Sequence, residues 1–244
     1  MTLRGCFVTG TDTEVGKTRV SAALLHWLTG QGQRSAGFKP VAAGTQRIAG
    51  VDVNDDVRAL REASSVSLSD AEVGPCQFRT ACAPHIAAAL DGRVIDRQAL
   101  LHSARALAER ADALVIEGVG GFCVPLGPGW DSADLALDLG LPVVLVVGLR
   151  LGCLNHALLT AEAVRARGLT LAGWVGNSVA AEMPWRKENM TTLKHELQRR
   201  HRARCLGMVP ALASPRPAAV CANLNHAALC QAFGLPAFPL VPQN

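Results

Sequence analysis

The sequence predicts an α/β fold in which helices cover both faces of a mainly parallel β-sheet. Six short apolar segments are continuous rather than alternating, which is typical of strands that are buried on both faces. Segments with the apolar spacing of amphipathic helices separate most of them. This alternation favours a parallel sheet, because parallel neighbours need a long crossover connection, usually a helix.

Three strands are predicted in the N-terminal half of the chain. The first, Gly5–Thr9, is followed by a glycine-containing loop and a predicted helix at Lys17–Thr29. The second strand is Ala36–Val41, and the third is Ala113–Glu117, which follows a predicted helix at Arg97–Arg110.

The C-terminal half repeats the same alternation. Three more strands and two more helices are predicted, the strands at Pro142–Gly148, Leu171–Gly176 and Cys205–Val209, the helices at Asn155–Arg167 and about Pro184–Arg202. The segment Ser214–Pro217 is the one expected break, and no repeat or low-complexity linker divides the chain. We therefore expect residues 1–244 to form a single domain.

The composition is that of a globular protein with no sign of nucleic-acid binding. Of 244 residues, 49% are apolar and 18% charged, and the net charge is only +4. The densest basic segment, His195–Arg204, has apolar positions at helical spacing, so we interpret it as the exposed side of a helix. The apolar stretch Leu139–Leu149 is too short to span a bilayer, and the N-terminus lacks a signal-peptide pattern. We expect a cytoplasmic protein that binds neither nucleic acid nor a membrane.

The cysteines and lysines carry further information. The eight cysteines form no C-x-x-C pair, and several lie in apolar runs, which indicates reduced thiols used as small hydrophobic residues. Only four of the 24 basic residues are lysines. Two of them, Lys17 and Lys39, lie near the ends of the first two predicted strands, where a compact ammonium group would serve a ligand.

The loop after the first strand resembles a phosphate-binding loop of the pattern G-x-x-x-x-G-K-[ST]. Gly16–Thr18 supplies Gly-Lys-Thr, but the upstream glycine, Gly10, lies one residue too early, so the loop contains an extra residue. Backbone N–H groups of such a loop bind phosphate, the lysine reaches the β- and γ-phosphates, and the threonine hydroxyl binds Mg²⁺. The alternative is a tight strand-to-helix turn with a capping threonine. The extra residue could bring one of three side chains toward a second ligand: Thr11, Asp12 or Glu14.

Two candidate side chains follow the second strand. Lys39 precedes Pro40, which fixes φ and forces the chain to turn, although a surface lysine before a loop is the alternative. In "DVNDDVRAL", Asp56 is a candidate carboxylate for a nucleotide-bound Mg²⁺. Equally, Asn54 or Asp55 could simply cap a helix there.

Glu117 ends the third predicted strand and is followed by Gly118, Gly120 and Gly121. A carboxylate at this position resembles the acidic metal-site residue of nucleotide hydrolases, and the glycines would let a ligand approach the backbone. The alternative is a glycine turn with an exposed glutamate at its edge. The position at a strand end favours metal binding.

Three later strand ends give weaker signals. Gly152–Asn155 offers backbone donors at a helix start that suit a carboxylate, although Asn155 could equally be a plain helix cap. Asn177 could pair with a purine edge, and the loop at Pro210 could flank the base. Asparagine and proline are also ordinary loop residues after strands.

Together these residues resemble the dethiobiotin synthetase family. The segments "VTGTDTEVGKT", "KPVAAG", "EGVGG", "LGCLNHALLT", "LAGWVGN" and "MTTL" occur in the family's order, from about Phe7 to Pro210. The resemblance implies a P-loop NTPase-like fold and a homodimer. It also implies an enzyme that joins CO₂ to 7,8-diaminononanoate with ATP and Mg²⁺, through a carbamate and a carbamic-phosphoric anhydride, to make dethiobiotin in biotin biosynthesis.

The resemblance also implies site residues by position. The Mg²⁺ ligands would be Thr18, Asp56 and Glu117. Residues around ATP would be Glu14, Val15, Gly16, Lys17, Thr18, Arg19, Asp56, Glu117, Gly118, Val119, Gly120, Asn177, Pro210, Ala211 and Leu212. Lys39 would be the catalytic lysine beside the carbamate, with Lys17 as a second fixed positive charge. Substrate contacts would come from Thr13, Lys39 and Ala43 and, in the neighbouring subunit, from Gly152, Cys153, Leu154, Asn155 and Asn189.

The chain departs from the family's pattern at two substrate positions. Ala43 stands where the family commonly has serine or threonine, so Thr45 or water would have to replace the hydroxyl. Asn189 stands where a tyrosine often precedes "MTTL", and the chain contains no tyrosine. There the asparagine or a helix N-terminus would have to hold the substrate carboxylate.

Two other functions remain as alternatives. Another P-loop amidoligase, such as a cobyrinate amide synthase, would usually carry a glutaminase domain, for which the chain has no room. A MinD/ParA-like ATPase switch would typically show a second lysine early in the loop, where this chain has Asp12 and Thr13. Such a switch would also have a membrane-binding C-terminal helix, but the tail "FGLPAFPLVPQN" contains prolines.

Overall fold

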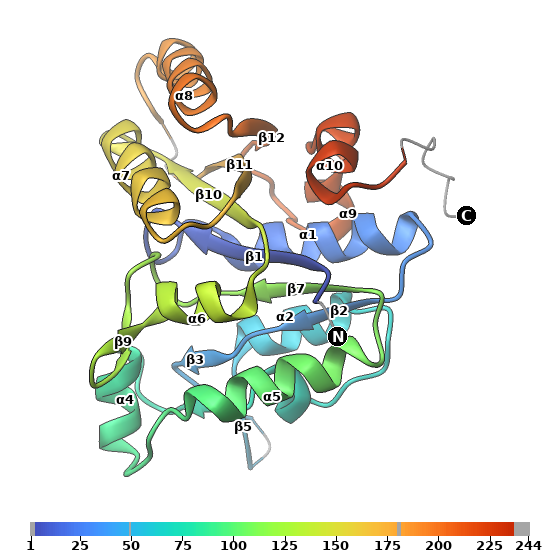
Figure 1. Cartoon of the computed structure of the whole chain (residues 1–244), viewed down its shortest axis with the longest axis vertical. Coiled ribbons are helices and arrows are strands. Elements are labelled where there is room, and N and C mark those ends of the chain that lie inside the picture. The colour runs from blue at the N-terminus through green and yellow to red at the C-terminus, as the bar shows by residue number, and fades with distance from the viewer. Residues whose placement is uncertain (1–2, 49, 180–181, 237–244) are drawn as a thin grey trace.

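The computed structural model describes residues 3–48, 50–179 and 182–236. Its centre is a six-stranded sheet in the order β12-β11-β10-β1-β7-β2 (Figure 1). All five neighbouring pairs are parallel. The strands are β1 Gly5–Gly10, β2 Ser35–Phe38, β7 Ala113–Glu117, β10 Val143–Leu149, β11 Leu171–Ser178 and β12 Arg204–Val209. The predicted parallel α/β fold is confirmed.

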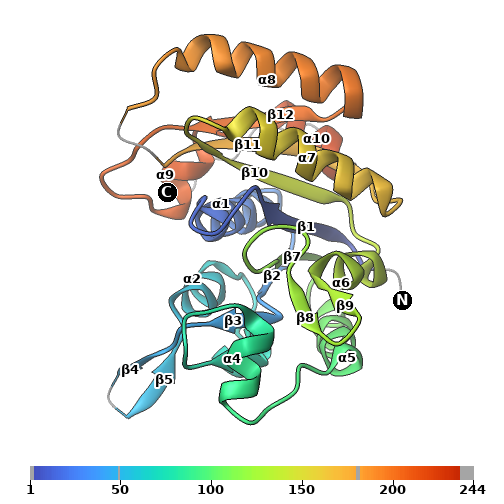
Figure 2. The ribbon, with the colours of Figure 1, turned by 90° about the vertical axis from the view of Figure 1, so that its left-hand side faces the viewer.

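Helices pack on both faces of this sheet, as predicted. One face carries α1 Lys17–Gly30, α2 Asp55–Ala63, α9 Pro217–Cys221 and α10 His226–Phe233. The opposite face carries α5 Arg97–Ala108, α6 Ser132–Leu139, α7 Cys153–Ala166 and α8 Arg186–His201. Figure 2 shows α7 and α8 lying side by side over the β10–β12 half of the sheet.

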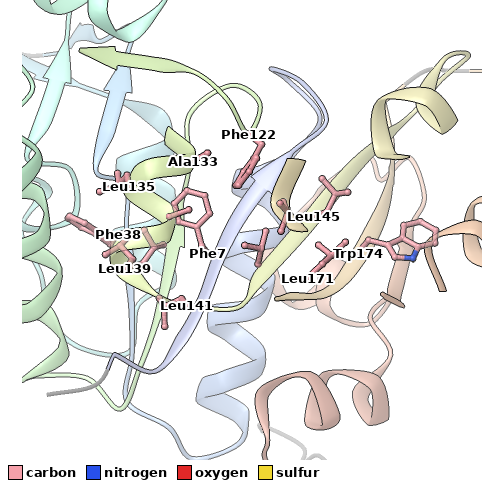
Figure 3. Close-up of a cluster of buried hydrophobic side chains, with 14 of the residues drawn as sticks. Phe7, Phe38, Phe122, Ala133, Leu135, Leu139, Leu141, Leu145, Leu171 and Trp174 are labelled. Carbon is pink, nitrogen blue, oxygen red and sulfur yellow. The ribbon is translucent and has the colours of Figure 1, made fainter. Parts of the chain in front are cut away.

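Alternate residues of the central strands enter two separate hydrophobic clusters. Phe7 of β1 packs with Phe38, Leu145 and Trp174 in the cluster under α5 to α8 (Figure 3). Its neighbours Cys6 and Val8 point to the other face and join the cluster under α1. Burial on both faces explains why the strands are continuous apolar runs, since each such side chain contributes about 1.5–3 kcal/mol when it leaves water.

Several short elements lie outside the main sheet. They are β3 Val41–Ala43 paired with β6 Cys76–Phe78, β4 Gln46–Ile48 with β5 Val51–Val53, β8 Pro125–Gly127 with β9 Trp130–Asp131, and the helices α3 Asp70–Val73 and α4 Pro84–Leu90. The β4–β5 hairpin projects from the body of the molecule (Figures 1 and 2). These elements were not predicted, because segments of two to seven residues carry little periodicity.

The predicted strand Ala36–Val41 is wrong at its carboxyl end. The strand β2 stops at Phe38, and Val41 begins the separate strand β3. Lys39 leaves the sheet because its backbone N–H donates to the carbonyl of Val73 at 2.7 Å, and Pro40 has no N–H to donate. This early end aims Lys39 at the carboxyl edge of the sheet, beside the end of β7.

The remaining sequence-level expectations concern the chain end, the membrane and the thiols. The segment after Ser214–Pro217 folds back onto the body, since α9 packs on α1. All eight cysteines are free thiols, as predicted. Of the helices within residues 3–48, 50–179 and 182–236, none has the length and apolar character needed to cross a bilayer.

Candidate functional site

The loop that joins β1 to α1 has the geometry of a phosphate-binding loop. Gly16 precedes the helix with φ of 89°, and no side chain caps the helix N-terminus. The first N–H groups of α1 are therefore left for an anion, which the helix dipole also favours. A Cβ on Gly16 would lie 2.1 Å from Asn177 Nδ2, so only glycine fits between the loop and the end of β11.

Both ends of this loop are tied to neighbouring strands. Thr11 N donates to the carbonyl of Val146 in β10 at 3.0 Å. Asn177 Nδ2 donates to the carbonyl of Val15 at 2.9 Å. Asn177 thus supports the loop in this structure, and its contact with a purine edge stays a prediction. Lys17 Nζ folds back along the loop and donates to the carbonyl of Asp12 at 3.0 Å.

Lys39 forms the centre of a buried polar cluster beside that loop. Its Nζ lies 2.6 Å from Glu117 Oε1 and 2.9 Å from Asp56 Oδ2, and it also donates to the carbonyl of Gly118 at 3.2 Å. The hydroxyl of Thr18 lies 2.7 Å from Asp56 Oδ1 and 2.9 Å from Glu117 Oε1. Residues from β1–α1, β2, α2 and β7 therefore meet at one point of the carboxyl edge. The alternatives of a surface lysine at Lys39 and an exposed glutamate at Glu117 are wrong, because both side chains are buried.

The charges of this cluster shift one another. Burial lowers the pKa of Lys39, but the carboxylates of Glu117 and Asp56 outweigh burial and hold it above its ordinary value. Burial likewise raises the pKa of Asp56, but the Lys39 ammonium, the Thr18 hydroxyl and Lys17 together outweigh burial and hold that pKa below its ordinary value. Burial, with the Lys39 charge as the next cause, lowers the pKa of Lys17 to about 8. Lys39 therefore stays an ammonium beside the charged Asp56, whereas Lys17 loses its proton more readily than Lys39 does.

The predicted metal ligands are suited to Mg²⁺. Thr18, Asp56 and Glu117 present hydroxyl and carboxylate oxygens to a common point, and Mg²⁺ prefers such ligands together with phosphate. Glu117 Oε2 is buried and has no hydrogen-bond partner in the part of the chain that the structure describes. A buried carboxylate oxygen without a partner fits a position where a cation would bind. Over the same part of the chain, no cluster of three or more histidine, cysteine, aspartate or glutamate side chains offers a different metal site.

The N-termini of α2 and α7 show which of the candidate residues Asn54 and Asn155 caps a helix. Asn54 caps α2, since its Oδ1 accepts hydrogen bonds from the backbone N–H groups of Asp56 and Val57. That cap leaves the Asp56 carboxylate free to reach the metal cluster. Asn155 is not a cap, because α7 begins at Cys153 after Gly152, whose φ is 94°. The helix N-terminus at Gly152 has no side-chain cap, as at α1.

A cavity of about 1100 Å³ opens at this edge of the sheet. It is lined by most of the predicted residues, namely Thr13, Glu14, Gly16, Lys17, Thr18, Arg19, Lys39, Ala43, Asp56, Glu117, Val119 and Gly120. It is also lined by Asp12, which the sequence marked only as a possible ligand contact, and by Gly121, one of the glycines expected to let a ligand approach the backbone. The sequence did not predict the remaining wall, at Ala81–Pro84, Val124 and Ser178–Val179. Apart from the Cys82 thiol and the Ser178 hydroxyl, this wall has no polar side chains. The part at Ala81–Pro84 follows β6, and only that position could have marked it.

Other predicted residues lie outside the cavity lining. Val15, Gly118 and Asn177 support the loop and the cluster from behind. Pro210, Ala211 and Leu212 follow the end of β12, and their contact with a nucleotide stays a prediction. Gly152 to Asn155 and Asn189 do not line the cavity of their own chain, and their contact with a substrate bound to another copy stays a prediction. Asn189 Nδ2 donates to the carbonyl of Trp185 in the first turn of α8.

Known proteins resemble this chain in sequence and in fold. A family model described as an AAA domain matches residues 4–219. The ATP-dependent dethiobiotin synthetase BioD of Janthinobacterium sp. (strain Marseille) is 51% identical over 228 residues, which cover 92% of this chain and 95% of that protein.

Two solved structures share the fold. The chain matches the MinC:MinD cell division protein complex of Aquifex aeolicus with a TM-score of 0.54 at 11% identity, over 99% of this chain and 98% of the matched one. It also matches the cell division ATPase MinD of Pyrococcus furiosus with a TM-score of 0.50 at 19% identity, over 84% and 83% of the two chains. At such low identity they support only the predicted P-loop NTPase-like fold. The 51% sequence identity over most of both chains shows more than the fold: the chain belongs to the ATP-dependent dethiobiotin synthetase family.

Proposed function

We propose that this protein uses ATP and Mg²⁺ to close 7,8-diaminononanoate and CO₂ into the cyclic urea of dethiobiotin. The observation that carries the proposal is the meeting of Lys17, Lys39 and the Thr18–Asp56–Glu117 oxygens at one cavity, in a chain 51% identical to a dethiobiotin synthetase. Phosphoryl transfer needs little beyond positioning and fixed positive charge, and the cavity supplies both.

The reaction has three steps with a balanced transfer of atoms. One amine of the substrate adds to CO₂, loses a proton and becomes a carbamate anion. A carbamate oxygen attacks the γ-phosphorus of ATP, the bond to the bridging oxygen breaks, and ADP leaves. The second amine attacks the carbonyl carbon of the mixed anhydride, a C–N bond forms, phosphate leaves, and a proton is released.

This chain's side chains support those steps through charge and geometry. The N-terminus of α1 and Lys17 bind the phosphates, so the γ-phosphorus is held next to the substrate. Lys39 carries a compact positive charge to the point where carbamate meets phosphate. Mg²⁺ held by Thr18, Asp56 and Glu117 would neutralise charge on the phosphate oxygens.

The active unit that we propose is a homodimer in the cytoplasm. Gly152 to Asn155 lie away from the cavity of their own chain but present an uncapped helix N-terminus, which suits the carboxylate of a substrate bound to a second copy. Eight free thiols agree with a reducing compartment. Sedimentation at micromolar concentration tests the dimer, and a monomer at full activity would contradict it.

The decisive experiment combines the protein with diaminononanoate, bicarbonate and Mg-ATP. We expect dethiobiotin and ADP in equal amounts, detected by mass spectrometry and a coupled ADP assay. ATP hydrolysis that does not depend on the diamine would instead support a MinD-like switch, and amide formation on another acid would support a P-loop amidoligase.

A further inference from the structure

Arg150 has no role in the proposed reaction, yet it contacts the phosphate loop. It follows the last residue of β10 and does not line the cavity. Its Nη2 lies 2.5 Å from Asp12 Oδ2. Asp12 does line the cavity, so an arginine outside the cavity neutralises a carboxylate inside it.

All three oxygens of Asp12 have a partner, one outside the loop and two within it. Oδ2 binds Arg150, while Oδ1 accepts a hydrogen bond from the backbone N–H of Thr13 at 2.8 Å. Its backbone carbonyl accepts from Lys17 Nζ at 3.0 Å. A shift of Asp12 would therefore move both the phosphate-binding lysine and the backbone that faces the phosphates.

The conformation of the loop needs such a restraint. Glu14 has φ of 59°, a left-handed conformation that is costly for a residue other than glycine and persists only when the surroundings hold it. Thr11 and Asn177 tie the two ends of the loop to β10 and β11. Between these ties, the Asp12–Arg150 ion pair joins the middle of the loop to the turn after β10.

We propose that Arg150 is a positioning residue for the nucleotide, which it serves by neutralising and fixing Asp12 in the phosphate loop. This rests on the proposed function, since it takes the bound triphosphate as the group that the loop must hold. Without Arg150, the Asp12 carboxylate faces the phosphates uncompensated, and like charges at this range repel. If Asp12 is replaced by a neutral residue as well, most of this repulsion between Asp12 and the phosphates disappears.

The fold does not depend on this ion pair. Its two side chains are 46% and 47% exposed, and exposed pairs add little to stability. Substitutions at either position therefore test the nucleotide site without unfolding the protein. The ion pair Arg34–Asp112 is exposed to a similar degree and provides the matched control. It lies at the amino end of β2, whereas the cavity lies at the carboxyl ends of the strands.

The test is a double-mutant cycle of Arg150→Gln, Asp12→Asn and both together, read as the affinity for Mg-ATP and Mg-ADP by titration calorimetry. We expect Arg150→Gln to weaken Mg-ATP binding about five- to tenfold, and the double variant to bind within about twofold of Asp12→Asn. Arg34→Gln should bind as the wild type does. An undiminished affinity in Arg150→Gln overturns the proposal, as does an additive effect, which would show that Arg150 acts independently of Asp12.

Two further measurements separate positioning from a general structural role. Arg150→Gln should raise KM for ATP and leave kcat nearly unchanged, because Arg150 does not contact the reacting groups, and Arg150→Lys should recover most of the loss. A fall in kcat with an unchanged KM contradicts the proposal. If the wild type makes no dethiobiotin, the proposed function fails, while the nucleotide titrations still decide the role of Arg150.

Discussion

Replacing Lys39 with glutamine tests whether this lysine balances the two carboxylates of the site. Its Nζ lies 2.6 Å from Glu117 Oε1 and 2.9 Å from Asp56 Oδ2, and the side chains of Lys39 and Glu117 are only 3% and 0% exposed. Removing one partner of a buried ion pair destabilises the folded state by about 3–5 kcal/mol. Asp56 is 43% exposed, so solvent screens its share, and we expect a loss of ~3 kcal/mol.

Thermal unfolding without Mg²⁺ measures this loss. For a chain of this size, ~3 kcal/mol corresponds to a fall in Tm of about 6–12 °C. Added Mg²⁺ should raise the Tm of Lys39→Gln more than that of the wild type, because a cation bound by Thr18, Asp56 and Glu117 replaces the missing positive charge. Lys194→Gln, which changes an exposed lysine of α8, is the control and should leave the Tm unchanged.

The loss should also depend on pH. In the wild type, Lys39 with the Thr18 hydroxyl and Lys17 outweighs burial and holds the pKa of Asp56 below its ordinary value. Asp56 therefore stabilises the protein above its unfolded pKa and loses that effect as the pH falls through the folded value. Without Lys39, only the Thr18 hydroxyl and Lys17 oppose burial, so we expect the pKa of Asp56 to rise and its charged form to stabilise the variant less or to destabilise it. The Tm gap should therefore be larger at about pH 7.5 than at about pH 5.

Equal Tm values for the wild type and Lys39→Gln at both pH values, with the same response to Mg²⁺, would refute this reasoning. Such a result would mean that solvent or a rearranged Thr18 already compensates the carboxylates. Activity alone does not decide the point, since the variant should be inactive either way.

Three more predictions concern the metal, the loop and the substrate. Glu117→Gln should raise the Mg²⁺ concentration for half-maximal activity about tenfold, and a chelator should abolish dethiobiotin formation; an unchanged Mg²⁺ titration would assign the metal to other residues. Gly16→Ala should cost about 1–3 kcal/mol and weaken nucleotide binding, because φ is 89° and the Cβ would meet Asn177. Gly168→Ala, with φ of 74° and open space around it, carries the strain without the clash, and equal losses of stability in the two variants would argue against the clash. Ala43→Ser should lower KM for the diamine about two- to fivefold and leave KM for ATP unchanged, because it restores a hydroxyl to the cavity wall; an unchanged diamine KM would place the substrate elsewhere.

The sequence predicts the sheet well because a strand buried on both faces appears in the sequence as a continuous apolar run. The strand Ala113–Glu117 is found with its predicted bounds, since an apolar run ends at a charged residue and glycines follow. The same logic places Glu117 and the Gly16–Thr18 loop at the carboxyl edge, where parallel strands bring them together. Local pattern and tertiary position agree at these residues, and the prediction succeeds for that reason.

Local sequence patterns do not predict which distant segments of the chain come into contact. Nothing near Lys39 in the chain shows that it contacts Asp56, because the contact depends on where Asn54 starts α2. The cavity wall at Ala81–Pro84 likewise depends on how the segment after β6 packs, and apart from Cys82 its small side chains carry no recognisable chemistry. The Asp12–Arg150 pair joins residues 138 positions apart, and neither end is unusual by itself.

The extra residue of the phosphate loop has a structural reason that the motif alone does not reveal. Thr11 N still bonds to β10, so the loop begins one residue after Gly10. Gly10 is needed for packing: a Cβ there would lie 2.6 Å from Val15 Cγ2 and 3.2 Å from Lys17 Cδ. Gly10, one residue early against the template, therefore makes room for the loop's own apolar residue and its lysine, while Gly16 provides the left-handed residue directly before α1.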